Sequence, residues 1–463
     1  MIPVPCFEGK RVAVFGLGRS GITAARALHA GGAIPILWDD GVSGRMQAEA
    51  EGFTVEDLNQ ADWSQFAALV LSPGAPLTYP KPHWTVDKAK AAAVEIIGDI
   101  ELFARAMDRT PGTVRPRVIA ITGTNGKSTT TALIGWVLKQ AGLKVAVGGN
   151  IGIGVLALPA PAEVGVYVIE VSSYQLDLTS SFAPDVAILT NVRPDHLDRH
   201  GGMEGYVAAK ARIFAHAGLS LVGVDEDWGR KILAGIKAGG RPAVEVTTGV
   251  SSSLAGDGSV EAAPGRMVVD GVAIDFRNAR SLPGRHNAQN AAFAYSAARA
   301  VGVPHEAAVE GLMTFPGLAH RMEHVGTLGR VRFINDSKAT NADAARQALS
   351  SYERSFWIAG GRAKAGGIDE LEDLFPRVVE AFLIGESAGP FAARLGDTPH
   401  RITGDMASAV AAAAEAAAAT GREEVVLLSP AAASFDQYPD FEVRGEAFRA
   451  AVLNLGATPS GHG

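Results

Sequence analysis

Cysteine is nearly absent from this sequence, since Cys6 is the only one among 463 residues. A single cysteine excludes a disulfide within the chain and a zinc site built from several cysteines. The first ten residues contain two prolines and Glu8 where a signal peptide needs an apolar run, and no later stretch reaches membrane-spanning length. We therefore expect a cytoplasmic protein without a membrane anchor.

An excess of positive charge is also missing, because 42 Lys and Arg residues face 49 Asp and Glu residues, a net charge of -7. This balance provides no general attraction for nucleic acid or anionic lipid, so we expect neither as a partner. Any anionic ligand must be bound by local groups. A hydrophobic content of 47% indicates a packed globular protein. One core rarely serves more than about 250–300 residues, which predicts two or three domains.

Apolar runs of strand length alternate with helix-like segments along most of the chain. Two breaks interrupt this alternation, a Pro- and Gly-containing stretch at 108–116 and the sequence Thr-Phe-Pro-Gly-Leu at 314–318. The pattern predicts an α/β protein with three domains, each built on a mostly parallel sheet. We place a Rossmann-like domain at 1–110, a P-loop-type domain at 111–315 and a second Rossmann-like domain at 316–463. The alanine-rich segment 409–418 predicts a plain helix, because alanine is the best helix former.

The strongest local signal is the segment Ile121–Thr130, Ile-Thr-Gly-Thr-Asn-Gly-Lys-Ser-Thr-Thr, between a predicted strand and a predicted helix. Glycines let backbone N–H groups approach phosphate oxygens, and the helix N-terminus adds positive potential. Lys127 can bridge the outer phosphates of a nucleotide, and Ser128 can ligate Mg²⁺. The loop is two residues shorter than the general phosphate-loop pattern. The alternative is a glycine-rich turn that carries a surface lysine.

A second glycine pattern, Gly16–Gly21, follows the first predicted strand and fits the dinucleotide-binding fingerprint. Asp39 and Asp40 end the next strand, where an acid that binds a ribose belongs. The pattern predicts a diphosphate-bearing ligand at the first helix, but it does not distinguish NAD from a UDP-sugar. A purely structural tight turn is the other interpretation.

Two further polar residues, Glu170 and His196, follow strands of the central domain. The carboxyl ends of parallel strands meet at one edge of a sheet, where ligands bind. Glu170 and His196 could therefore join Ser128 around a metal-bound phosphate. Taken alone, each would more often be a capping or solvated residue.

Together these motifs resemble the Mur ligase family, and within it the members that add D-glutamate. The resemblance runs from Lys10 to about Phe448. It is carried by Gly123–Thr129, by Glu-Val-Ser-Ser-Tyr-Gln-Leu from Glu170, by Asn-Val-Arg-Pro-Asp-His-Leu-Asp from Asn191, by Gly-Arg-His-Asn-Ala-Gln-Asn from Gly284, by Asn-Asp-Ser-Lys-Ala-Thr-Asn from Asn335, and by Leu428–Tyr438 with Phe441, Arg444 and Gly445.

This resemblance implies an ADP-forming ligase that joins D-glutamate to UDP-N-acetylmuramoyl-L-alanine through an acyl phosphate. ATP is the implied co-substrate, with two Mg²⁺ ions, and we expect a monomer. The implied catalytic residues are Lys127, His196 and Lys210. The implied ATP-binding residues are Gly123, Thr124, Asn125, Gly126, Lys127, Ser128, Thr129, Asn287, Asn290, Arg321 and Asp336.

The resemblance also assigns the other two substrates and the metal. The UDP-substrate residues are Leu17, Arg19, Ser20, Asp39, Asp40, Ser72, Pro73, Gly74, Asn150 and Gln175. The D-glutamate residues are Lys338, Thr340, Lys364, Ser434, Phe435 and Phe441. The metal ligands are Ser128, Glu170, His196 and, if it is carbamylated, Lys210.

Several alternatives stay open at this point. Another Mur ligase or a folylpolyglutamate synthetase-like enzyme shares the phosphate loop, although the latter lacks the leading glycine fingerprint. An NAD-dependent oxidoreductase would explain Gly16–Gly21 but leave Lys127 and Ser128 without a role. A nucleotide-binding regulator would need no amino acid pocket. Lys210 could be an unmodified surface lysine, and Phe435 and Phe441 could simply pack in the core.

Overall fold

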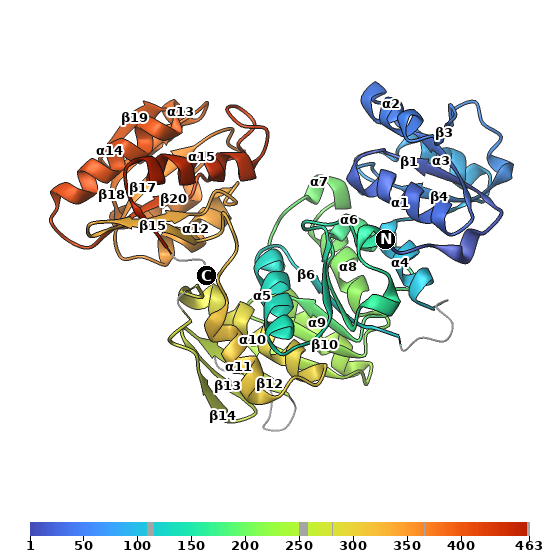
Figure 1. The fold of residues 1–463 in the computed structure, drawn as a ribbon, viewed down its shortest axis with the longest axis horizontal. Coiled ribbons are helices and arrows are strands. Elements are labelled where there is room, and N and C mark those ends of the chain that lie inside the picture. The colour runs from blue at the N-terminus through green and yellow to red at the C-terminus, as the bar shows by residue number, and fades with distance from the viewer. Residues whose placement is uncertain (109–114, 250–257, 280, 365, 461–463) are drawn as a thin grey trace. The chain divides into compact units, whose positions relative to one another are not determined.

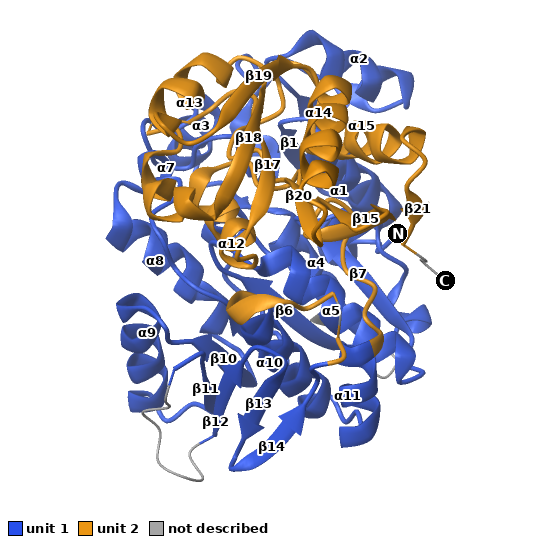
Figure 2. Ribbon diagram, turned by 90° about the vertical axis from the view of Figure 1, so that its left-hand side faces the viewer, with its two compact units in different colours: residues 1–277, 287–313 blue, residues 278–286, 314–463 orange. Residues whose placement is uncertain are grey.

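The computed structural model describes residues 1–108, 115–249, 258–279, 281–364 and 366–460 (Figure 1). The chain forms two compact units: unit 1 comprises residues 1–277 and 287–313, and unit 2 comprises residues 278–286 and 314–463 (Figure 2). Within the described residues, unit 1 contains two sheets and unit 2 contains one. These mostly parallel sheets confirm the predicted α/β class. The three domain boundaries stay a prediction, and the linker expected at 108–116 lies largely outside the described residues.

The first sheet of unit 1 is entirely parallel, with the order β3-β2-β1-β4-β5. Its strands are β1 (Arg11–Phe15), β2 (Ile34–Trp38), β3 (Thr54–Val55), β4 (Phe66–Leu71) and β5 (Glu95–Ile97). Its helices are α1 (Arg19–Ala30), α2 (Val42–Ala50), α3 (Trp84–Ala91) and α4 (Asp99–Asp108), with the short turns η1 (Pro5–Phe7) and η2 (Trp63–Gln65). Phe15 pairs with both Trp38 and Leu71, so three strands end together at one edge.

The second sheet has the order β14-β13-β12-β11-β10-β9-β6-β8-β7. Its strands are β6 (Arg117–Thr122), β7 (Val145–Gly149), β8 (Val166–Glu170), β9 (Val186–Leu189), β10 (Leu219–Gly223), β11 (Ala243–Thr247), β12 (Ser259–Ala263), β13 (Arg266–Val269) and β14 (Val272–Asp275). Strands β6 to β12 pair in parallel, whereas β12 to β14 form an antiparallel extension that the sequence did not predict.

The helical elements that accompany the second sheet differ widely in length. They are α5 (Lys127–Gln140), α6 (Ser173–Asp177), α7 (Leu197–His200), α8 (Met203–Ala211), α9 (Asp227–Ala238), α10 (Gly284–Ala300), α11 (His305–Thr314), η3 (Val155–Ala157), η4 (Pro161–Glu163) and η5 (Arg212–Phe214). Every residue of β8 and of β9 is buried, as expected for strands covered on both faces.

Unit 2 is built on a sheet of order β19-β18-β17-β20-β16-β15-β21, in which β15 is antiparallel to both neighbours. Its strands are β15 (Glu323–Leu328), β16 (Val331–Asn335), β17 (Ser355–Gly360), β18 (Val378–Ile384), β19 (His400–Gly404), β20 (Glu424–Leu428) and β21 (Thr458–Pro459). Its helices are α12 (Ala342–Ser350), η6 (Asp369–Arg377), α13 (Ala388–Leu395), α14 (Met406–Ala419) and α15 (Phe441–Asn454). Helix α14 confirms the helix predicted for the alanine-rich segment.

Unit 1 holds its two sheets together with a shared core and a buried polar anchor. One hydrophobic cluster contains Val12 and Leu28 from the first sheet layer and Val118 and Leu189 from the second. The carboxylate of Glu101 in α4, which is fully buried, accepts hydrogen bonds from the backbone N–H groups of residues 180 and 181 at 2.8 and 2.9 Å. Among the described residues, no helix combines the length and apolar character needed to cross a bilayer.

Candidate functional site

The predicted phosphate loop connects β6 to α5 and lies between the ends of β8 and β9. Gly123 and Gly126 adopt φ angles of +146° and +82°, which L-residues with side chains rarely adopt. Gly126 caps α5, so the N–H groups of the first turn have no partner within the helix. The loop therefore has the backbone form that binds phosphate at a helix N-terminus.

A segment after β9 fixes this loop through hydrogen bonds. The N–H of Asn125 donates to Oδ1 of Asn191 at 2.8 Å, and Nδ2 of Asn191 donates to the carbonyl of Asn125 at 3.0 Å. The N–H of Thr124 donates to the carbonyl of Asn191 at 3.0 Å. Asn191 belongs to a motif that carried the resemblance, and the structure gives it a definite task, which is to preorganise the loop.

The two side chains that follow the loop lie at its base. Nζ of Lys127 donates to the carbonyls of Gly123 and Thr124 at 2.9 and 2.8 Å, so the ammonium group lies against its own loop. Ser128 is buried within the first turn of α5. A phosphate at this loop would meet both the ammonium group and the helix N-terminus.

Glu170 shows the strongest fit to a bound cation. The side chain is 2% exposed, and its Oε1 accepts a hydrogen bond from Nδ2 of Asn150 at 2.8 Å. Its Oε2 is buried and has no hydrogen-bond partner. A buried carboxylate oxygen without a donor is costly unless a cation satisfies it. Since carboxylate oxygen is the ligand that Mg²⁺ prefers, this atom suits the predicted metal.

His196 lies in a left-handed backbone conformation with φ +53° just before α7. Its Nε2 is 3.3 Å from Oδ2 of Asp195, and its ring centroid is 5.1 Å from that of Tyr174. No group of three or more His, Cys, Asp or Glu side chains suited to a metal occurs in the described part of the chain. A metal here would therefore depend on other ligands as well, such as the Ser128 hydroxyl and a modified Lys210.

Lys210 is a buried lysine rather than a surface one, with 2% of its surface exposed. Its Nζ donates to the carbonyl of Gly123 at 2.8 Å and lies 4.6 Å from the ring centroid of Tyr206. Burial, and then the positive charge of Lys127, hold the pKa of Lys210 well below its usual value. A larger share of this amine is therefore neutral, and hence nucleophilic, than for an ordinary lysine.

One asparagine of α10, Asn290, contacts the loop helix within unit 1, and the other, Asn287, is bonded to Asn290. Oδ1 of Asn290 accepts a hydrogen bond from the hydroxyl of Thr130 at 3.0 Å, and its Nδ2 donates to Oδ1 of Asn287 at 3.1 Å. A Cβ placed on Gly126 would lie 2.8 Å from Oδ1 of Asn290. The structure therefore brings Asn290 to the phosphate loop and Asn287 next to Asn290, while the binding of a nucleotide by these two residues stays a prediction.

The first sheet gathers the predicted nucleotide residues at its carboxyl edge. Oδ2 of Asp39 accepts from the N–H of Leu17 at 2.5 Å, and its Oδ1 accepts from the N–H of Gly41 at 2.7 Å. Oδ2 of Asp40 lies 3.1 Å from Nε2 of His83. Asp39 thus shapes the glycine-rich turn as well as facing the predicted ligand edge.

Three further predicted UDP-substrate residues, Arg19, Ser20 and Ser72, contact neighbouring segments of unit 1. A Cβ on Gly16 would approach Cβ of Ser72 to 2.5 Å, so the glycine turn and the Ser72–Gly74 loop touch. Nη1 of Arg19 donates to the carbonyl of Gly152 at 2.8 Å, in the loop after β7. Ser20 interacts with the buried carboxyl of Asp99, whose pKa is raised by burial.

Gln175 is largely occupied by contacts within the protein. Its Oε1 accepts from the N–H of Ser172 at 3.0 Å in a capping box, and its Nε2 donates to both oxygens of Asp99 at 3.1 and 3.0 Å. The side chain is 2% exposed. The contact of Gln175 with the substrate stays a prediction. A substrate at this position would compete with Ser172 and Asp99 for the side-chain amide of Gln175.

In unit 2, the segment Asn-Asp-Ser-Lys-Ala-Thr begins at the last residue of β16, at the carboxyl edge of the sheet. Asp336 is buried, accepts from the hydroxyl of Ser429 at 3.0 Å and from the N–H of Met322 at 3.2 Å, and burial raises its pKa to about 7. Arg321 partly offsets this shift by its charge. Nζ of Lys338 lies 3.7 Å from the ring centroid of Phe441.

The other predicted amino acid residues differ in exposure. Ser434 is buried, whereas Phe435 is 66% exposed and Lys364 is exposed. Phe435 therefore does not pack in a core, which removes one alternative for that residue. Thr340 follows Lys338 in a tight turn, with its N–H donating to the Lys338 carbonyl at 2.8 Å.

Two buried residues that organise these edges, Tyr206 and Arg444, received no role from sequence reasoning. The hydroxyl of Tyr206 hydrogen-bonds to that of Thr124 at 3.0 Å. The sequence offered a signal for this residue, because Tyr206 lies four residues before Lys210 and therefore on the same face of α8. Arg444 is 1% exposed and donates to the hydroxyl and carbonyl of Ser337 at 3.0 and 2.8 Å and to the carbonyl of Ala432 at 3.0 Å. It joins two loops of unit 2, and its burial lowers its pKa to about 10.

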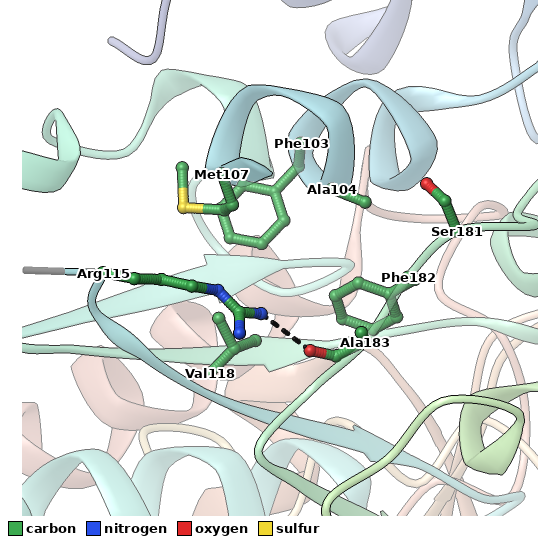
Figure 3. A pocket seen from close by; sticks show the side chains of 8 residues that line it. All are labelled: Phe103, Ala104, Met107, Arg115, Val118, Ser181, Phe182 and Ala183. Atoms are coloured by element: carbon green, nitrogen blue, oxygen red, sulfur yellow. Dashed lines mark hydrogen bonds between the residues drawn. The ribbon is translucent and has the colours of Figure 1, made fainter. Parts of the chain in front are cut away.

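Unit 1 also contains a small cavity beside α4 (Figure 3). Phe103, Ala104 and Met107 of α4 line one side of it, and Arg115 donates to the carbonyl of Ala183 at 2.8 Å on another. None of the predicted site residues lines this cavity. It therefore contributes nothing to the candidate site.

Comparison with known proteins supports the resemblance. The family model of the Mur ligase middle domain matches residues 121–298, and that of the Mur ligase glutamate ligase domain matches residues 320–432. The chain is 60% identical to the UDP-N-acetylmuramoylalanine–D-glutamate ligase of Caulobacter sp. (strain K31), over 98% of each sequence. It is 56% identical to the protein of the same name from Phenylobacterium zucineum (strain HLK1), again over 98% of each.

Solved structures support the fold. The UDP-N-acetylmuramate-alanine ligase of Thermotoga maritima gives a TM-score of 0.58 at 16% identity, covering 96% of this chain and 99% of its own. A pseudomurein peptide ligase type C from Methanothermus fervidus gives 0.55 at 18% identity, covering 96% and 100%. At these identities the likeness concerns the fold alone.

Proposed function

Because this chain belongs to the Mur ligase family, we propose that it ligates D-glutamate to UDP-N-acetylmuramoyl-L-alanine in peptidoglycan precursor synthesis. ATP is consumed, and ADP and phosphate are the other products. The observation that carries the proposal is the phosphate loop beside Glu170, whose buried Oε2 has no hydrogen-bond partner and suits Mg²⁺. The 60% identity to a UDP-N-acetylmuramoylalanine–D-glutamate ligase supports the choice of substrates. We further propose that the enzyme acts as a cytoplasmic monomer.

The chemistry requires activation of a carboxylate, which is a poor electrophile. Phosphoryl transfer from ATP converts it to an acyl phosphate, and the amine of D-glutamate then attacks the acyl carbon and expels phosphate. Lys127 leaves the carbonyls of its own loop to neutralise charge on the transferring phosphoryl group. The loop N–H groups hold the nucleotide, with Asn287 and Asn290 supporting the loop. No protein nucleophile is needed.

Two Mg²⁺ ions would be held by Ser128, Glu170, His196 and a carbamylated Lys210. They supply charge stabilisation for the phosphates when bound. Carbamylation adds the neutral Nζ of Lys210 to the carbon of CO₂ with loss of one proton to water, which replaces a cation by an anionic oxygen ligand. The burial and lowered pKa of Lys210 support this step, since only the neutral amine reacts.

We assign the UDP-linked substrate to the first sheet of unit 1 and D-glutamate to the sheet of unit 2. The uridine diphosphate would bind at the turn Leu17–Ser20 with Asp39, Asp40 and the Ser72–Gly74 loop, and Asn150 would lie toward the muramoyl-alanine end. D-glutamate would bind in unit 2, where the exposed cation of Lys364 can pair with its side-chain carboxylate. We assign Lys338, Thr340, Ser434, Phe435 and Phe441 to the same pocket.

ADP release that requires both co-substrates tests the proposal, since a regulator or an oxidoreductase would not show it and a folate-type ligase would need another acceptor. Replacing Lys127 by Ala should lower the rate by at least about a hundredfold, the loss typical of a group that stabilises transition-state charge. Lys139→Ala, on an exposed position of the same helix, is the control and should retain the rate. Equal activity of Lys127→Ala and wild type would contradict the proposal. Competition between D- and L-glutamate tests the stereochemical assignment.

A further inference from the structure

Three side chains of unit 1 form a hydrogen-bonded series beside the predicted metal ligands, in which Ser173 and His200 are buried and Asp177 is partly exposed. His200, at the end of α7, places its Nδ1 3.1 Å from Oδ2 of Asp177 and its Nε2 3.0 Å from the hydroxyl of Ser173. In the neutral imidazole, donation of the Nδ1–H to the carboxylate leaves Nε2 to accept from the hydroxyl. The imidazole is thus held at both nitrogens.

The order Ser173, His200, Asp177 is also that of a nucleophilic triad, but the exposure of the serine argues against such a role. Ser173 is 3% exposed and forms the first turn of α6, so no substrate reaches its hydroxyl. Its hydroxyl is engaged with His200. The series therefore fixes an imidazole ring rather than activating a nucleophile.

The ring held in this way packs against two tyrosines, each of which contacts a predicted site residue. The ring of His200 stacks on Tyr174, with centroids 5.4 Å apart and planes 12° apart, and Tyr174 in turn lies 5.1 Å from the ring of His196. The ring of His200 also lies 5.4 Å from the ring of Tyr206, with the two planes tilted by 53°. Tyr174 is additionally covered by the guanidinium of Arg199, 4.6 Å from its centroid.

Tyr206 extends this packing to the phosphate loop. Its hydroxyl is 3.0 Å from that of Thr124, and its ring lies 4.6 Å from Nζ of Lys210. The imidazole of His200 therefore contacts two tyrosines. Tyr174 packs against His196, and Tyr206 packs against Lys210 and bonds to the phosphate loop. Tyr174 belongs to α6 and Tyr206 belongs to α8.

We propose that His200 is a positioning residue, which sets the ring of His196 through Tyr174 and the phosphate loop with Lys210 through Tyr206. The inference rests on the proposed function, because that function assigns His196 and Lys210 to the metal. The geometry favours orientation over simple packing, since both ring nitrogens are bonded and the ring plane is fixed. Groups that orient metal ligands typically contribute about 10–100-fold to metal affinity or activity.

The test replaces His200 by Phe, which retains a ring for stacking but loses both hydrogen bonds. We expect kcat to fall about tenfold and the Mg²⁺ concentration needed for half-maximal ATP binding, measured by calorimetry without the other substrates, to rise about tenfold. KM for D-glutamate, whose pocket lies in unit 2, should stay within about twofold. His216→Phe is the matched control, because His216 is exposed and contacts neither tyrosine ring.

A second pair of variants separates orientation from stability. Asp177→Asn retains an oxygen that accepts the Nδ1–H and should restore nearly normal Mg²⁺ dependence, whereas Asp177→Leu should reproduce the defect of His200→Phe. This pair decides the matter even if His200→Phe fails to fold, as judged by circular dichroism. Mg²⁺ dependence equal to that of wild type in both His200→Phe and Asp177→Leu would overturn the proposal. A wild-type protein that binds MgATP but ligates no D-glutamate would instead refute the proposed function.

Discussion

Two glycines at opposite ends of helix α5 allow the cost of the phosphate-loop geometry to be measured. Gly126 precedes the helix and Gly142 follows it, and both have φ +82°. A Cβ on Gly142 meets no atom within 4 Å, whereas one on Gly126 would lie 2.8 Å from Oδ1 of Asn290. The substitution Gly142→Ala therefore measures backbone strain alone, and Gly126→Ala measures the same strain plus displacement of Asn290.

The expected magnitudes follow from these contacts. A left-handed conformation costs an L-residue about 1–2 kcal/mol, which is the expected destabilisation by Gly142→Ala. Moving Asn290 breaks its bonds to Thr130 at 3.0 Å and to Asn287 at 3.1 Å. Two lost hydrogen bonds add about 1–3 kcal/mol, so Gly126→Ala should cost about 2–5 kcal/mol in all.

Thermal unfolding and ATP binding by calorimetry together test this reasoning. Gly126→Ala should weaken ATP binding at least about tenfold, because about 1.4 kcal/mol of misplaced loop donors suffices for that change. Gly142→Ala should bind ATP as wild type does, since it lies a full helix length from the loop. If the two variants lose equal stability and both bind ATP normally, neither the close approach to Asn290 nor the loop's role in binding ATP holds.

Three further predictions concern charged groups. Activity should decline when bicarbonate is stripped from the assay and recover on its return, and Lys210→Arg, which cannot be carbamylated, should be inactive at any bicarbonate concentration; indifference of wild type to bicarbonate would count against carbamylation. Because burial raises the pKa of Asp336 from 3.8 to about 7, the folded state binds the proton more tightly than the unfolded state, and stability should fall as the pH rises through that interval. Asp336→Asn should abolish this fall, which amounts to about 2–3 kcal/mol between pH 5 and pH 8, as measured by unfolding midpoints at those two pH values. Glu101→Ala should destabilise the protein by about 1–3 kcal/mol, because it removes the buried carboxylate that accepts from the N–H groups of residues 180 and 181. Glu95→Ala, which removes an exposed ion pair with the same Arg105, should cost less than about 1 kcal/mol, and similar losses for both would refute the anchoring role of Glu101.

The elements that carry the site were largely predictable from local sequence. Strands β2 (Ile34–Trp38) and β9 (Val186–Leu189) coincide with apolar runs of strand length in the sequence, and the helix predicted after the phosphate loop runs from Lys127 to Gln140. Buried parallel strands leave continuous apolar runs, and each glycine turn marks the point where the chain leaves the sheet. The antiparallel strands β13 and β14 were missed, because their short, half-exposed runs carry no such signal.

The sequence by itself determined which chemical groups this protein offers and at which sheet edges they lie, because strand periodicity and glycine turns are local properties of the chain. Only the tertiary structure decided how those groups are held. It buried Lys210 and so lowered its pKa, left one oxygen of Glu170 without a donor, and set His200 between Tyr174 and Tyr206. Burial, pairing and ring packing depend on residues distant in sequence, so they are decided only when the chain folds.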